Sequence, residues 1–150
     1  MNNAHSELYR RENGVSEVCR ISVVDDDESV REAIYDLMDC MGLRTELFSS
    51  AEDFLNSGSL RHTTCLIVDV RMPGMSGLEL QSHLNAAGSR IPIIFISAHD
   101  DGEAESRALG AGAIDFLKKP FSEDALFRAL RACQKIEGDV TNDLGGNESF

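Results

Sequence analysis

The chain has 150 residues, of which 42% are hydrophobic and 27% are charged, a composition typical of one soluble globular domain. It carries 14 basic against 26 acidic residues and no basic cluster, so direct binding to DNA or RNA is not expected. No apolar run approaches the roughly 18 residues that a membrane-spanning helix needs. Residues 1–20 lack the apolar core of a secretory signal. We therefore expect a cytoplasmic protein that does not bind membranes.

The cysteines are widely and irregularly spaced. None belongs to a CxxC pair, and none has a histidine at zinc-ligand spacing. They are Cys19, Cys40, Cys65 and Cys133. This pattern predicts reduced, mostly buried thiols in a reducing compartment.

The chain begins with an irregular segment, after which strands and helices alternate. Residues 1–17 lack periodicity and are predicted to form a flexible arm. The apolar run 18–24 predicts a buried strand. Asp27 can then cap a helix over 28–41, whose apolar residues recur at helical spacing. A second strand is predicted at 43–48.

The middle of the chain repeats this alternation. Serine caps predict helices at 50–57 and 77–87, each with an acidic residue three positions after the cap. Between them, the apolar run 64–68 predicts a third strand. The Pro-Gly pair within 71–75 predicts a loop directly after it.

The last part of the chain predicts four further elements and a tail. The run 93–97 is apolar on both faces and predicts a strand, and a weaker helix follows at 102–109. A fifth strand is predicted at 113–118 and a final helix at 123–135. Residues 136–150 are acidic, contain no base and are predicted to form a disordered tail.

Strands that alternate with helices, and that are apolar on both faces, predict a parallel sheet covered on both sides. We predict an α/β, flavodoxin-like doubly wound domain over residues 18–135, with strand order 2-1-3-4-5 and five helices. In this order the first and third strands are neighbours, and ligands bind at their carboxyl ends. Asp25 and Asp26 follow the first strand and Asp69 follows the third, so these carboxylates are predicted to meet.

Four segments of the chain form a recognisable set: residues 23–27 (VVDDD), 69–77 (DVRMPGMSG), 96–98 (ISA) and 118–121 (KKPF). In order and spacing they resemble the receiver domain of two-component response regulators. The resemblance covers about residues 18–135, and segments 97–99 and 110–116 are most similar to receivers of the FixJ/LuxR type. The resemblance implies a CheY-like fold and a phosphorelay switch.

The resemblance also assigns roles to the acidic residues. Asp69 would be the phosphoacceptor, since a carboxylate is a usable nucleophile for phosphoryl transfer. Asp26, Asp69 and the backbone carbonyl of Arg71 would bind Mg²⁺ directly, and Asp25 would act through water. Mn²⁺ or Ca²⁺ could substitute. For Asp27 we expect a helix cap rather than a metal ligand.

Three further residues complete the implied site. Lys119, before Pro120, would neutralise charge on the phosphoryl oxygens, and the resemblance implies a cis peptide bond between these two residues. Ser97 would be the switch hydroxyl, and its structural alternative is a turn serine satisfied by the backbone. Phe116 would be the switch aromatic, turning inward on activation. The alternative for Phe116 is plain core packing.

These roles imply a signalling receiver rather than an enzyme acting on a separate substrate. The expected partners are a sensor histidine kinase or phosphotransfer protein and a downstream protein that reads the face formed by 102–109, 113–118 and 123–135. A homodimer through this face is left open. We expect a natural single-domain regulator, and the alternative is a receiver cut from a FixJ/LuxR-type DNA-binding transcription factor.

Two other classes use related parts of the same architecture. An aspartate-nucleophile, Mg²⁺-dependent phosphatase of the haloacid dehalogenase type requires a second aspartate two positions after the nucleophile. This chain has Arg71 there, which counts against that class. A flavodoxin requires a phosphate-binding loop after the first strand, where this chain instead has a run of acidic residues that would repel phosphate.

Overall fold

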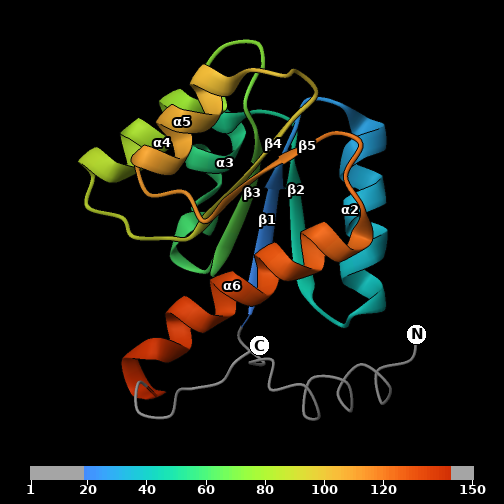
Figure 1. Ribbon diagram of the computed structural model, residues 1–150, viewed down its shortest axis with the longest axis vertical. Helices are drawn as coiled ribbons and strands as arrows, with labels where there is room; N and C mark the ends of the chain where they lie inside the picture. The colour runs from blue at the N-terminus through green and yellow to red at the C-terminus, as the bar shows by residue number, and fades with distance from the viewer. Residues whose placement is uncertain (1–18, 143–150) are drawn as a thin grey trace.

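The computed structural model describes residues 19–142, and it describes side chains as far as Gln134. The predicted arm at 1–17 and the end of the predicted tail, 143–150, lie outside the described residues. Within the described part the chain forms one parallel sheet with helices on both of its faces (Figure 1).

The sheet confirms the predicted strand order. Its five strands pair in parallel in the order β2-β1-β3-β4-β5. They are β1 (Arg20–Val24), β2 (Arg44–Phe48), β3 (Cys65–Asp69), β4 (Ile93–Ser97) and β5 (Asp115–Lys118). All residues of β3 and β4 are buried, as expected for central strands covered on both faces.

The helices divide between the two faces and enclose a separate apolar cluster on each. On one face α2 (Glu28–Cys40) and α6 (Glu123–Asn142) pack on residues such as Ile67 and Ile96. On the other face α3 (Ala51–Ser57), α4 (Gly77–Ala86) and α5 (Gly102–Gly110) pack around residues such as Phe54 and Phe95. Figure 1 shows this division, with α2 and α6 on one side of the sheet. Burial on both faces fixes the register of the strands and therefore the positions of their ends.

Local hydrogen bonds start the helices where the sequence predicts. Asp27 accepts a hydrogen bond from the Ser29 backbone, at 3.0 Å, and caps α2. Ser50 caps α3. Ser76 and Glu79 exchange both hydrogen bonds of a capping box at the start of α4. These caps fix the loops that follow the strands, and the site lies in these loops.

Most predicted elements are present, but several boundaries differ from the prediction and one short element is additional; β1, for example, begins at Arg20 rather than at 18. β5 begins at Asp115 rather than at 113, because the Ala113 N–H still bonds to the Ala108 carbonyl and closes the end of α5. A 3-10 turn, η1 (Ser59–Arg61), follows α3 and was not predicted. Helix α6 continues to Asn142 instead of ending at 135, so residues 136–142 are helical and not part of a structureless tail. An acidic composition without proline does not by itself end a helix.

Candidate functional site

Three carboxylates lie together at the carboxyl ends of β1 and β3. The register pairs Val24 with Val68, which places the next residues of the two strands, Asp25 and Asp69, side by side. Together with Asp26 they offer ligand oxygens that all lie within 4.8 Å of one another. Asp25 is fully buried, Asp69 is 7% exposed and Asp26 is exposed. The predicted convergence of these acids is therefore present, and we call this group the acidic rim.

Asp25 is held from both sides of its side chain. Its Oδ1 accepts a hydrogen bond from the Asp27 backbone at 2.9 Å, and its Oδ2 accepts one from Lys119 Nζ at 3.0 Å. Arg31, one turn into α2, donates to the Asp25 carbonyl at 2.8 Å. Both carboxylate oxygens of Asp25 are thus engaged, whereas Asp26 faces solvent.

Lys119 brings a positive charge to the rim from the far edge of the sheet. Its backbone N–H donates to the Ser97 carbonyl at 2.7 Å, and its Nζ lies 3.0 Å from Asp25 and 3.5 Å from Asp69. The peptide bond between Lys119 and Pro120 is cis, as the resemblance implied. Burial lowers the pKa of Lys119, but the carboxylates of Asp25 and Asp69 outweigh it and raise that pKa above its usual value.

The charge balance at the rim is unfavourable for Asp69. Burial and the neighbouring Asp25 raise the pKa of Asp69 to about 6, although Lys119 and a hydrogen bond with the Arg71 backbone act in the opposite direction. One lysine therefore does not offset the crowded carboxylates. A divalent cation would offset the charge of these carboxylates, and a donor set made only of oxygen atoms suits Mg²⁺. Among the described residues, this is the one acidic, histidine or cysteine group compact enough to hold a metal ion.

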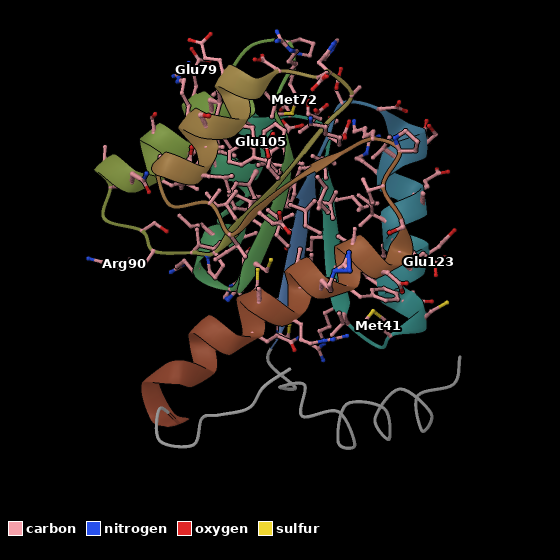
Figure 2. The ribbon with its side chains drawn as sticks, viewed as in Figure 1. Met41, Met72, Glu79, Arg90, Glu105 and Glu123 are labelled. Atoms are coloured by element: carbon pink, nitrogen blue, oxygen red, sulfur yellow. The ribbon has the colours of Figure 1, made fainter. Side chains whose placement is uncertain are left out.

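The loop after β3 is fixed by two residues that the sequence did not reveal as site residues. A Cβ added to Gly77 would lie 2.2 Å from the Asp69 carbonyl oxygen and 3.2 Å from the Phe95 ring, so only glycine fits. Glu52 of α3 accepts a hydrogen bond from the Met75 backbone at 2.9 Å. Gly77 is part of the segment 69–77 that resembles the receiver domain, so the sequence offered a reason to single it out. Glu52 lies in no such segment, and nothing in the sequence pointed to it. Figure 2 labels Met72 in this loop, at the opposite end of the sheet from Arg90.

Ser97 is buried at the end of β4 and is already satisfied by its own turn. Its Oγ accepts a hydrogen bond from the His99 N–H at 3.1 Å and donates to the His99 carbonyl at 3.2 Å. The turn-serine alternative therefore describes this conformation. A role in switching would require Ser97 to exchange these contacts for others.

Phe116 on β5 is 6% exposed and packs in the core against Phe95, with ring centroids 6.2 Å apart and an interplanar angle of 30°. The ring therefore already lies inside the core in this structure, and an inward turn on activation would need an outward-facing conformation that this structure does not show. Packing against Phe95 stabilises this buried position because it keeps the apolar Phe116 ring out of water.

The segment from Ser97 to Asp101 is tied to both neighbouring parts of the molecule. Lys118 on β5 donates to Asp100 at 2.8 Å and lies 4.0 Å from Glu105 on α5, which Figure 2 labels. Arg71, in the loop after Asp69, pairs with Asp101 at 2.5 Å. This segment, 97–101, is called the switch segment below. Its ion pairs connect it to β5 and to the loop that follows Asp69.

The part of the chain that the structure describes contains no helix long and apolar enough to cross a membrane. This finding agrees with the absence of a long apolar run from the sequence.

Known proteins share both the sequence and the fold of this chain. The family model for the response regulator receiver domain matches residues 21–131. The response regulator protein TodT of Pseudomonas putida is 49% identical over 116 residues, which cover 77% of this chain and 51% of TodT. The transcriptional regulatory protein FixJ of Azorhizobium caulinodans is 42% identical over 112 residues, which cover 75% of this chain and 53% of FixJ.

Solved structures agree with these relatives. The crystal structure of FixJ-N has a TM-score of 0.71 at 33% identity, covering 78% of this chain and 94% of that one. The response regulator StyR has a TM-score of 0.71 at 43% identity, covering 83% of this chain and 65% of that one. The chain spans about half the length of the curated relatives that it matches. By sequence and by fold, it belongs to the response regulator receiver domain family of two-component systems.

Proposed function

We propose that Asp69 accepts a phosphoryl group from a phosphohistidine of a sensor histidine kinase or phosphotransfer protein. The observation that carries this proposal is the acidic rim itself. Asp25, Asp26 and Asp69 place oxygens within 4.8 Å of one another, and Lys119 lies 3.5 Å from Asp69. A lysine and a divalent cation beside one carboxylate are the groups needed to bring an anionic phosphoryl group close to it.

The donor set fits Mg²⁺, with Mn²⁺ or Ca²⁺ as substitutes. Asp26, Asp69 and the Arg71 backbone carbonyl would hold the ion. Both oxygens of Asp25 are engaged by Lys119 and the Asp27 backbone, which supports an indirect role for Asp25 through water. The ion would supply positive charge against the transferring phosphoryl oxygens and the rim carboxylates.

In the transfer step, an oxygen of Asp69 forms a bond to phosphorus while the bond between phosphorus and the histidine nitrogen of the donor breaks. Lys119 is positioned to offset the charge on the phosphoryl oxygens. The product is an acyl phosphate on Asp69, and attack of water on its phosphorus returns the carboxylate and releases phosphate. The chain thus supports both its own phosphorylation and its own dephosphorylation.

The phosphoryl oxygens are new acceptors that Ser97 can reach only by leaving its contacts with His99. Movement of the switch segment would then alter its contacts with β5 and with the start of α5, which Asp101 caps. We define the switch face as α5, β5 and α6, the edge of the sheet where β5 has no further strand beside it in the described structure. Phosphate that binds one arrangement of the switch segment better shifts the population of this face.

A downstream protein that reads the switch face is the proposed partner. TodT and FixJ are about twice the length of the matched region, so two forms of output stay open: contact by this chain alone, or control of a DNA-binding domain joined to it. A homodimer through the switch face is compatible with either form. We also propose a cytoplasmic location, which agrees with the absence of a spanning helix among the described residues.

Labelling with acetyl phosphate tests the proposal. We expect the wild-type chain to gain one phosphoryl group in the presence of Mg²⁺, measured by intact-protein mass spectrometry, and to gain none in EDTA. Asp69→Asn should gain none. The matched control is Asp27→Asn, which keeps the helix cap, because asparagine caps as well as aspartate. Full labelling of Asp69→Asn, or loss of labelling in Asp27→Asn, would contradict the assignment.

A further inference from the structure

Two cysteine side chains from distant parts of the chain meet inside the core. Cys65 is the first residue of β3, and Cys133 lies on α6. Their Sγ atoms are 2.9 Å apart although 68 positions separate them in the sequence. Each residue is 2% exposed and belongs to the apolar cluster that α2 and α6 form with the sheet. Figure 1 shows α6 crossing the sheet near the ends where the strands begin.

We propose that Cys65 and Cys133 are a redox modification site, at which a peroxide converts the two thiols into an intramolecular disulfide that fastens α6 to β3. A disulfide has an S–S length of about 2.05 Å, so the two sulfur atoms need to approach by roughly 0.9 Å. In a close-packed core, a shift of this size is within the reach of side-chain rotation. A thiol reductant returns the pair to its reduced form.

The chemistry requires one molecule of hydrogen peroxide for each disulfide. One thiol loses its proton, its thiolate attacks a peroxide oxygen, the O–O bond breaks, and sulfenic acid forms, while the leaving hydroxide takes up that proton to give one water. The second thiol attacks the sulfenic sulfur, the S–S bond forms, and a second water leaves. The two sulfur atoms together lose two electrons and the peroxide gains them. Because both thiols are buried, the reaction proceeds during transient opening of the α6 contacts and is slow.

The other two cysteines make the proposal specific. Cys19 lies in the same apolar cluster, but its sulfur accepts hydrogen bonds from Thr64 Oγ1 at 3.5 Å and Gln134 Nε2 at 3.9 Å. Cys40 is exposed on α2. A general reaction of the chain with peroxide would therefore modify Cys40 first. The observation that selects Cys65 and Cys133 for an internal disulfide is the 2.9 Å separation of their sulfur atoms.

The pair is well separated from the acidic rim. Cys65 and Asp69 are the first and last residues of β3, which at about 3.3 Å per residue places them on the order of 13 Å apart. The disulfide therefore does not touch the phosphorylation chemistry, but it does restrain α6, one element of the switch face. That consequence for the switch face rests on the proposed function, whereas disulfide formation does not.

Peptide mapping tests the proposal directly, because trypsin places each cysteine in a separate peptide. Cleavage after arginine and lysine gives peptides 12–20, 32–44, 62–71 and 132–135. The folded chain is treated with hydrogen peroxide, remaining thiols are alkylated in denaturant, and the digest is analysed without reductant. We expect peptide 62–71 linked to peptide 132–135, the link lost on treatment with dithiothreitol, and a raised Tm for the oxidised chain.

Variants separate the proposed pair from its neighbours. Cys40→Ser removes intermolecular cross-links through the exposed thiol and should keep the internal link. Cys19→Ala, a matched buried control, should also keep it, while Cys133→Ala should abolish it. If 62–71 and 132–135 are recovered alkylated and unlinked after Cys40 has been fully oxidised, the proposal is overturned. A link from Cys19 to either residue in the wild-type chain would overturn it as well.

Discussion

The acidic rim and the switch segment lie close together, yet their interactions are balanced in opposite ways. At the rim, three carboxylates share one nearby lysine, and burial beside Asp25 raises the pKa of Asp69 to about 6. In the switch segment, Ser97 exchanges hydrogen bonds with the His99 backbone. Asp100 forms an ion pair with Lys118, and Asp101 forms one with Arg71. The rim is under electrostatic strain, and the switch segment is satisfied.

This difference explains how one region could drive the other. Because Ser97, Asp100 and Asp101 each have a partner, movement of the switch segment has to break these contacts. Under the proposed function, a divalent cation would offset the crowded carboxylates of the rim, and a phosphoryl group on Asp69 would add acceptors that compete for the Ser97 hydroxyl. We propose that ligand binding at the rim would in this way favour an arrangement in which the contacts of the switch segment are broken.

Removing Lys119 should have the largest effect, because it leaves Asp25 and Asp69 buried without their cation. In EDTA at pH 7, we expect Lys119→Met to lower the free energy of unfolding by about 3 kcal/mol, the cost of breaking a buried pair on one side. Urea denaturation measures this change. Lys118→Met is the matched control, since Lys118 is exposed and should show no comparable loss. Equal losses in the two variants would contradict the electrostatic account of the rim.

The raised pKa of Asp69 predicts a pH-dependent cost to stability. Below about pH 3.8, Asp69 is protonated in both the folded and unfolded states and costs nothing. Between pH 3.8 and about 6 the unfolded chain loses this proton first, so stability falls as pH rises. Above about 6 the full cost, about 3 kcal/mol, is present.

Asp69→Asn should therefore stabilise the metal-free chain at pH 7 by up to about 3 kcal/mol while abolishing phosphoryl labelling. At pH 4 the two proteins should unfold at nearly the same urea concentration. Urea midpoints of the wild type and the variant, measured in EDTA across this range, test the sign. A variant that is less stable than the wild type at pH 7 would show that Asp69 carries no electrostatic cost.

Gly77→Ala should disturb the rim through packing rather than charge. The added methyl group would overlap the Asp69 carbonyl and force the start of α4 away from β3, at a cost of about 1–3 kcal/mol. Gly102→Ala is the matched control, because a Cβ there meets nothing within 4 Å. Thermal unfolding should show a lower Tm for the first variant and an unchanged or higher Tm for the second. A neutral Gly77→Ala would mean that the loop after β3 adapts freely.

The sequence predicted the architecture well because its signals were periodic and repeated. Continuous apolar strands and serine or aspartate caps fixed the order of the elements, and the strand order then brought Asp25 and Asp69 together. The errors fell where such signals end. Residue 113 lies before β5 rather than in it, because its N–H bonds back to the end of α5, and α6 passes 135 without any breaking residue.

The site could be predicted only in part, for a different reason. Charged residues at strand ends are visible in the sequence, so the members of the rim were named correctly as neighbours. Contacts between residues far apart in the sequence could not be predicted. They are the hydrogen bond from the Met75 backbone to Glu52, the lack of space for a side chain at Gly77, and the packing of Phe116 against Phe95. These are properties of packing between elements far apart in the sequence. The chemical roles proposed for the residues of the acidic rim stay predictions.

The most direct test of the central claim, that binding at the rim shifts a satisfied switch segment, is amide hydrogen exchange with beryllofluoride and Mg²⁺ as a stand-in for the phosphoryl group. We expect faster exchange at His99, whose N–H loses Ser97 as its partner, and altered exchange along α5. Ser97→Ala should bind the ligand without the response in α5. If amides at the rim respond while residues 97–101 and α5 of the wild-type chain stay unchanged, the account is contradicted.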